Sequence, residues 1–142
     1  MKSFVKSFFI LFMLAALVFL SSNSSLALKT PSENEKWDDY AVDEEGNAYF
    51  YNSKNVQHMT KNIVRVWIKK FYSQQKSKVE EAKLLWEIDC SKKTMRGIQA
   101  HMKNRDKTSD TIKKPSEWSS IPSESTAETL YEIVCKKGEK AK

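Results

Sequence analysis

The sequence has little of what catalysis and metal binding depend on. Only two cysteines, two histidines and three glycines occur among 142 residues. The motifs G-x-S-x-G, H-E-x-x-H, G-x-G-x-x-G and C-x-x-C are absent, which removes the usual short signatures of hydrolases, zinc proteases, dinucleotide enzymes and redox proteins. Two cysteines cannot complete a four-ligand zinc site, and neither His58 nor His101 stands at ligand spacing from them. We therefore expect no catalytic activity, no metal and no other cofactor.

Long hydrophobic runs are equally scarce. The one candidate is Phe8–Leu20, thirteen uncharged apolar residues that follow Lys2 and Lys6. A basic start, a short apolar run and small residues ending at Ala27 are typical of a secretory signal peptide, and they predict cleavage after Ala27. An uncleaved anchor is the alternative, but a spanning helix needs about 20 apolar residues. No cysteine follows the run to accept a lipid, so we do not expect a lipoprotein.

Cleavage after Ala27 would leave 115 residues, a length that suits one domain. Both cysteines lie in this part, and the oxidising compartment that exported proteins enter favours a Cys90–Cys135 disulfide over two unpaired thiols. The predicted organisation is a signal peptide at 1–27, a flexible lead-in at 28–36, one folded domain at 37–136 and a disordered tail at 137–142.

The net charge is modest. It is +6 for the whole chain, and the expected leader contributes two of these charges, which leaves about +4 on the mature domain. A nucleic-acid partner would need a denser basic stripe and would conflict with export, so we expect none. Attraction to anionic surfaces remains compatible with this charge.

Alternating apolar and polar residues predict several strands. The five segments are Trp37–Val42, Ala48–Asn52, Ile63–Tyr72, Lys83–Cys90 and Thr94–Lys103. The acidic stretch before Ala48 ends in Gly46 and Asn47, which fits a tight turn; a calcium loop is the alternative, but the ligand spacing of an EF-hand is missing. Ser73–Glu81 and Asn104–Lys114 are expected to be polar connections, with a helical turn at Val79–Lys83 as an alternative for the first.

One helix is predicted near the C-terminus. Ser125 and Glu128 match a capping box, so the helix should run from Thr126 to about Lys136. The disulfide would then tie this helix to the strand that ends at Cys90. Strands first and one helix last predict an α+β fold, an antiparallel β-sheet of about five to six strands with one C-terminal α-helix packed on it and one disulfide. Before the helix, Trp118 and Ile121 should pack in an ordered loop.

The outward side of the third strand is the candidate binding face. It carries basic and aromatic side chains in one row: Arg65, Trp67, Lys69 and Phe71. Exposed rings supply rigid contact area and cations supply steering, so such a row suits protein recognition. The alternative is that Trp67 is covered, while Arg65 and Lys69 pair across strands with Glu87 and Asp89.

Core aromatics, a turn glycine and two cysteines form a longer pattern. Its segments are Trp37, Asp43-Glu-Glu-Gly46-Asn-Ala-Tyr49-Phe50-Tyr51, Val64-Arg65-Val66-Trp67-Ile-Lys69, Leu85-Trp86-Glu-Ile88-Asp-Cys90, Ser116-Glu-Trp118-Ser-Ser-Ile121-Pro122 and Leu130-Tyr131-Glu-Ile133-Val134-Cys135. From about Trp37 to Lys136 this pattern resembles the bacterial surface-adhesin protein E family. The resemblance implies an antiparallel sheet with a disulfide-joined C-terminal helix, export, and display at the outer membrane.

The resemblance also implies partners. The family's named member binds host matrix proteins and plasminogen and forms dimers, so extracellular matrix or envelope proteins are the expected partners and a homodimer is one candidate assembly. Two functions stay open. The domain is either an adhesin-like module that binds a macromolecule in the periplasm or at the cell surface, or a periplasmic accessory protein that acts through protein–protein contacts. Neither requires a transmembrane segment after signal cleavage.

Overall fold

The computed structural model describes residues 35–73 and 77–136. The expected signal peptide, most of the lead-in and the tail at 137–142 lie outside the described residues. The described part forms one antiparallel sheet of eight strands. The strands are β1 (Asp38–Val42), β2 (Ala48–Tyr51), β3 (Gln57–His58), β4 (Ile63–Phe71), β5 (Val79–Asp89), β6 (Thr94–Asn104), β7 (Ser109–Ile112) and β8 (Ser119–Ser120). The helical segments are the 3-10 turn η2 (Ser53–Asn55), the α-helix α2 (Thr126–Tyr131) and its π-helical continuation η3 (Glu132–Lys136).

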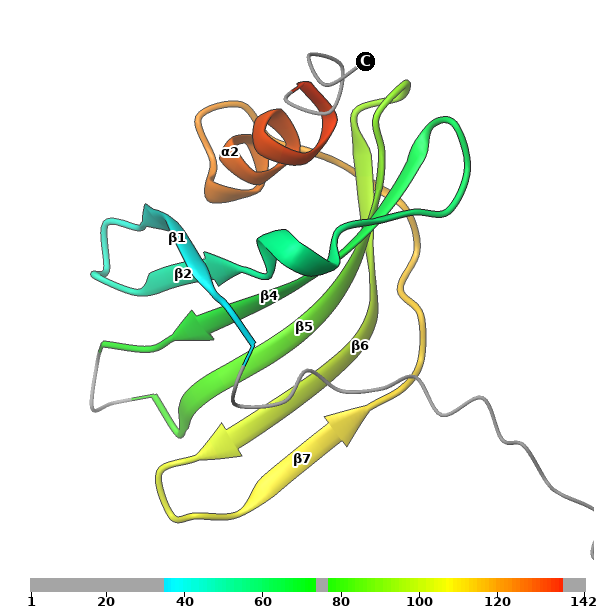
Figure 1. Cartoon of the computed structure of the whole chain (residues 1–142). Coiled ribbons are helices and arrows are strands. Elements are labelled where there is room, and N and C mark those ends of the chain that lie inside the picture. The colour runs from blue at the N-terminus through cyan, green and yellow to red at the C-terminus, as the bar shows by residue number, and fades with distance from the viewer. Residues whose placement is uncertain (1–34, 74–76, 137–142) are drawn as a thin grey trace, which may run out of the picture. The chain divides into compact units, whose positions relative to one another are not determined.

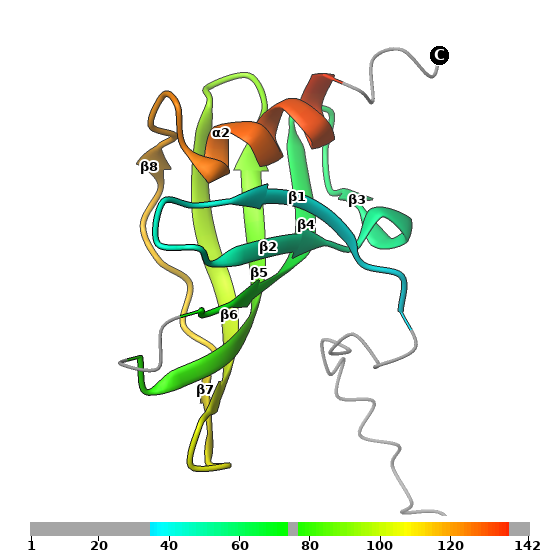
Figure 2. The same cartoon turned by 90° about the vertical axis from the view of Figure 1, so that its left-hand side faces the viewer.

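Three long strands, β4, β5 and β6, form the centre of the sheet, whose order is β1-β2-β4-β5-β6-β7. Two short strands lie on each side of this centre. On one side, β2 and β3 pair with different parts of β4. On the other side, β7 and β8 pair with different parts of β6. The sheet curves, and α2 lies across one end of it (Figure 1). Seen from the helix side, the β1–β2 hairpin lies in front of the long strands (Figure 2). We call the side of the sheet that faces α2 the inner face and the opposite side the outer face.

The core lies between the inner face and the helix. Alternation along β4 places Val64, Val66 and Ile68 on this face, as the sequence predicted, and all three are buried. They pack with apolar side chains from β5, β6, the loop before the helix and the helical segment: Ile88, Met95, Ile121, Leu130 and Val134. The helix thus covers apolar sheet surface that would otherwise face water.

The predicted turn after β1 forms, and Asp43 organises it. Its Oδ1 accepts hydrogen bonds from the backbone N–H groups of Glu45, at 3.1 Å, and Asn47, at 2.9 Å. Its Oδ2 accepts from the Tyr49 hydroxyl at 2.9 Å. Gly46 has φ +79°, a left-handed conformation that favours glycine. Both carboxylate oxygens of Asp43 therefore accept hydrogen bonds from groups of the same hairpin.

The helix begins where the capping residues predict. The Ser125 hydroxyl accepts from the backbone N–H of Glu128 at 3.1 Å, while the Glu128 carboxylate accepts from the backbone N–H of Glu124 at 2.7 Å, one residue before the position that a standard capping box uses. At the far end, Cys135 forms the predicted disulfide with Cys90, with a Cα–Cα distance of 5.6 Å. The disulfide therefore joins the C-terminal helical segment to the end of β5.

The predicted strand count of five to six is too low. The structure has eight strands, three of which, β3, β7 and β8, are short, exposed and mostly polar and pair with the long strands through their backbones. Such edge strands lack apolar alternation, so periodicity does not reveal them. The helical turn considered at Val79–Lys83 is also wrong: β5 begins at Val79, and Ala82 pairs with Met102 of β6.

Removing the disulfide should destabilise the domain. The bridge closes a sequence separation of 45 residues, for which the chain-entropy model gives about 4 kcal/mol in the free energy of unfolding. The double variant Cys90→Ser, Cys135→Ser should lose about that amount in urea unfolding, and reductant should not change it further. Identical unfolding midpoints for the oxidised and reduced wild-type protein would contradict this expectation.

Candidate binding face

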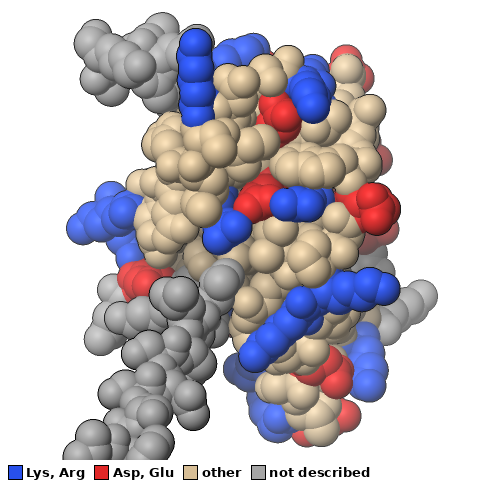
Figure 3. All heavy atoms as spheres, turned by 90° about the vertical axis from the view of Figure 1, so that its right-hand side faces the viewer, with Lys and Arg blue, Asp and Glu red and all other residues tan. Residues whose placement is uncertain are grey.

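The outer face of the sheet holds a row of charged side chains. Arg65 of β4 lies opposite Glu87 of β5, which lies opposite Arg96 of β6. Figure 3 shows basic and acidic side chains alternating across this side of the molecule, with uncharged surface between them. The register of three neighbouring strands, rather than a sequence motif, brings these residues together.

Glu87 is the centre of this row. It is only 4% exposed and uses a different oxygen for each arginine. Its Oε1 accepts from Arg65 Nε at 3.1 Å and Nη2 at 2.5 Å, and its Oε2 accepts from Arg96 Nε at 2.9 Å and Nη2 at 2.7 Å. Burial by itself raises the pKa of this carboxyl, but the hydrogen bonds and charges of Arg65 and Arg96 outweigh burial and hold the pKa of Glu87 below its ordinary value. We call these three residues the arginine ladder.

An exposed indole ring extends the ladder. The Arg96 guanidinium lies 4.7 Å from the centre of the Trp118 ring, which is 39% exposed. The sequence predicted that Trp118 and Ile121 would both pack inward. Ile121 is buried, whereas Trp118 stacks on Arg96 at the surface, because a cation of the sheet provides a contact for its ring.

The predicted row along β4 is split by burial. Trp67 is only 3% exposed, so the expectation of an exposed ring at this position is wrong. It is covered on the outer face, where the His101 ring stacks on it with ring centres 6.2 Å apart and planes at 23°. The alternative interpretation predicted that Trp67 would be covered and that Arg65 would pair across strands. Both are observed, since Arg65 pairs with Glu87.

The other two predicted residues form a second, aromatic group. The Lys69 ammonium lies 4.5 Å from the centre of the Trp37 ring and 5.8 Å from that of Phe71. Phe71 packs edge-to-face on Phe50, with ring centres 5.7 Å apart, yet remains 38% exposed. The sequence did not predict the contribution of Phe50 and Trp37. Phe50 reaches Lys69 only through the pairing of β2 with β4, and Trp37 precedes β1.

The two histidines lie in separate strands, β3 and β6, and have different surroundings. His58 is an exposed residue of β3. Burial and the nearby charges of Lys113 and Lys83 lower the pKa of His101, which hydrogen-bonds to the Thr111 hydroxyl at 2.9 Å. Within residues 35–73 and 77–136, no three His, Cys, Asp or Glu side chains are placed to hold a metal ion.

The fold and this face define a small disulfide-linked α+β domain that presents charged and aromatic side chains on one side of a sheet. The chain belongs to the surface-adhesin protein E family, since the model of that family matches residues 37–136. Comparison with curated protein sequences gives no match. The described part contains no helix with the length and apolar character needed to cross a membrane.

Solved structures share the fold. One structure of Haemophilus influenzae protein E has a TM-score of 0.53 at 14% identity and covers 80% of this chain and 96% of that one. A second crystal form has a TM-score of 0.52 at 12% identity and covers 77% and 95%. At these identities the likeness concerns architecture alone. Membership of a surface-adhesin family implies an exported or cell-surface location and suggests a non-enzymatic binding protein.

Replacing the central carboxylate should destabilise the ladder. Glu87→Gln leaves two half-buried guanidiniums without their counter-charge, which should cost about 3 kcal/mol in the free energy of unfolding. Because the folded pKa lies below the ordinary 4.5, the carboxylate stabilises the wild type above that value, and the stabilisation is lost as pH falls through the lowered pKa.

Urea unfolding at several pH values measures both effects. The variant should show a weaker loss of stability on acidification than the wild type. The exposed Glu117→Gln provides the control and should match the wild type at each pH. A Glu87→Gln protein as stable as this control would contradict the importance of the ladder.

Proposed function

We propose that the domain is an exported binding module of the cell envelope that holds a protein partner on its outer face, without catalysis. The observation that carries the proposal is the combination of the arginine ladder with two exposed rings, Trp118 and Phe71. Aromatic and arginine side chains dominate the energetics of protein interfaces. The family match supports a binding role.

The ladder is suited to an acidic patch on the partner. Two guanidiniums share one carboxylate, so the ladder carries a net positive charge. Both guanidiniums are fixed by paired hydrogen bonds, and Arg96 is fixed further by Trp118. A preorganised side chain loses less conformational entropy when it binds, so these groups offer contacts at low cost. Charge complementarity would set the orientation of the partner.

A periplasmic accessory protein is the second candidate. It is favoured by β7, whose four residues are all exposed at the outer edge of the sheet. An open edge can add a strand from another chain, including a second copy of this one, through backbone hydrogen bonds. The partner would then be another envelope protein, or the protein would act as a homodimer.

Protease treatment of intact cells separates the two candidates. A surface-displayed adhesin should lose its described domain to added protease, as detected by antibody against that domain. A periplasmic protein should be cleaved only after the outer membrane is permeabilised. Protection on intact cells would contradict surface display and would support the accessory role.

The exposed rings allow a direct test of the outer face. The double variant Trp118→Ala, Phe71→Ala should weaken binding to immobilised matrix proteins, or capture of envelope proteins, by at least about ten-fold, because truncating anchor residues costs about 2 kcal/mol or more. Val42→Ala, at an exposed position of β1, is the control and should bind as the wild type does. Unchanged affinity in a folded double variant would exclude this face as the site.

A further inference from the structure

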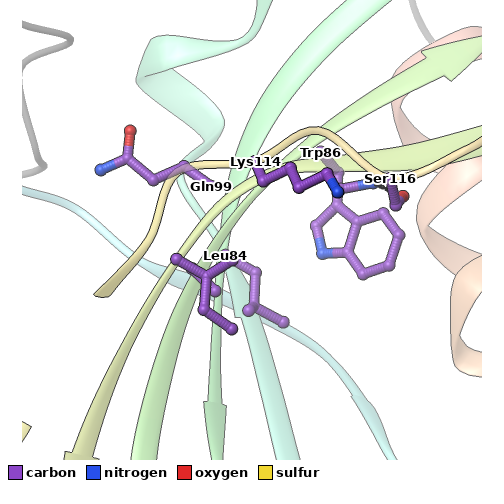
Figure 4. Close-up of a pocket in the computed structure, with 8 residues that line it drawn as sticks. Leu84, Trp86, Gln99, Lys114 and Ser116 are labelled. Carbon is purple, nitrogen blue, oxygen red and sulfur yellow. Dashed lines mark hydrogen bonds between the residues drawn. The ribbon is translucent and has the colours of Figure 1, made fainter. Parts of the chain in front are cut away.

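The inner face carries an apolar hollow that the proposed function does not use. It has a volume of about 230 Å³ and lies beside β6, near the sheet edge formed by β7 (Figure 4). The register explains it. Leu84 and Trp86 of β5 lie opposite the small residues Ala100 and Gly97 of β6, and Ala100 in turn lies opposite Ile112 of β7. Small residues between large ones leave a depression in a surface that otherwise packs closely.

A second hollow of about 280 Å³ adjoins the first. It lies between the β1–β2 hairpin and α2, and Leu84 and Trp86 line both hollows. We call the pair the inner trough. Ligand sites occupy about 300–1,000 Å³, and the two hollows together fall in that range. At the end of the inner trough nearest β7, Ile112 is 50% exposed. An apolar occupant would therefore remove further apolar surface from water.

A cation stands at the mouth of the first hollow. Figure 4 shows the Lys114 side chain extending beside Trp86 and Ser116. The residues that line this hollow include Lys114 and no carboxylate. None of the ion pairs between described residues uses Lys114. The lysine of the second hollow, Lys70, differs in this respect, because its ammonium lies 3.9 Å from the carboxylate of Asp43. The positive charge available to an occupant is therefore at the Lys114 end.

We propose that the inner trough binds a free single-chain amphiphile with an anionic head group. Its alkyl chain lies on the row formed by Leu84, Ala100 and Ile112 and against the Trp86 ring, and its head group lies near the Lys114 ammonium. Burial of the chain provides affinity, and the lysine selects the sign of the head group. This site is on the opposite face from the arginine ladder and does not depend on the proposed protein partner.

Two matched probes test the site: sodium decanoate and decyltrimethylammonium, each below its micelle-forming concentration. We expect saturable decanoate binding, with amide NMR shifts centred on Gly97, Ala100 and Ile112, and at least about five-fold weaker binding of the cationic probe. Lys114→Gln should weaken decanoate binding about five-fold, the effect of one exposed charge. The adjacent Lys113→Gln, which does not line the hollow, should change it less than two-fold.

Filling the hollow provides an independent variant. Ala100→Leu should weaken decanoate binding at least ten-fold while leaving the outer-face interaction intact; if this variant does not fold, the Lys114→Gln and amide-shift results decide. Equal binding of both probes, shifts centred elsewhere, or unchanged binding in a folded Ala100→Leu protein would overturn the proposal. So would co-sedimentation with phosphatidylglycerol vesicles that requires Lys114 without saturable decanoate binding, which would indicate a membrane surface as the occupant.

Discussion

The covalent link between Cys90 and Cys135 is the constraint on which the rest of the structure depends. The α-helix it holds has only six residues, far fewer than an isolated helix needs in water. Near the link, the Tyr131 hydroxyl donates to the Cys90 carbonyl at 3.1 Å, and Lys93 forms an ion pair with Glu128. The disulfide, these polar contacts and the apolar core therefore all join the helical segment to the sheet.

Placement of the helix gives the two faces of the sheet different roles. The inner face buries most of its apolar residues under α2 but leaves a trough where β6 carries Gly97 and Ala100. On the outer face, side chains of the sheet itself cover apolar surface, as the stacking of His101 on Trp67 shows. There the carboxylate of Glu87 pairs with both Arg65 and Arg96, and the rings of Trp118 and Phe71 remain exposed.

Much of the fold could be predicted from the sequence, because local signals specify it. The period-two pattern around Val66 identifies β4, Gly46 identifies the first turn, and Ser125 with Glu128 identifies the start of the helix. The edge strands could not be predicted in this way, since residues such as Ser119 join the sheet through backbone bonds that leave no side-chain pattern.

The candidate site was less predictable, because it depends on register. The alternation of apolar and polar residues along β4 correctly predicted that Arg65 lies on the outer face. It does not predict whether a side chain on that face is exposed or covered. Burial of Trp67 requires the ring of His101, which lies two strands away and offset along the sheet, to stack on it. The position of Trp118 requires a loop that returns to Arg96. Neither relation appears in any short stretch of sequence. The inner trough likewise depends on register, because it forms where Ala100 of β6 lies opposite Leu84 of β5.

Amide hydrogen exchange followed residue by residue, before and after reduction, tests most directly whether the disulfide holds the helix on the sheet. We expect reduction to lower the protection of the amides in α2 and η3 at least ten-fold more than that of the paired amides of β4 and β5. Equal protection of the helical segment in the oxidised and reduced protein would contradict the central role of the Cys90–Cys135 link.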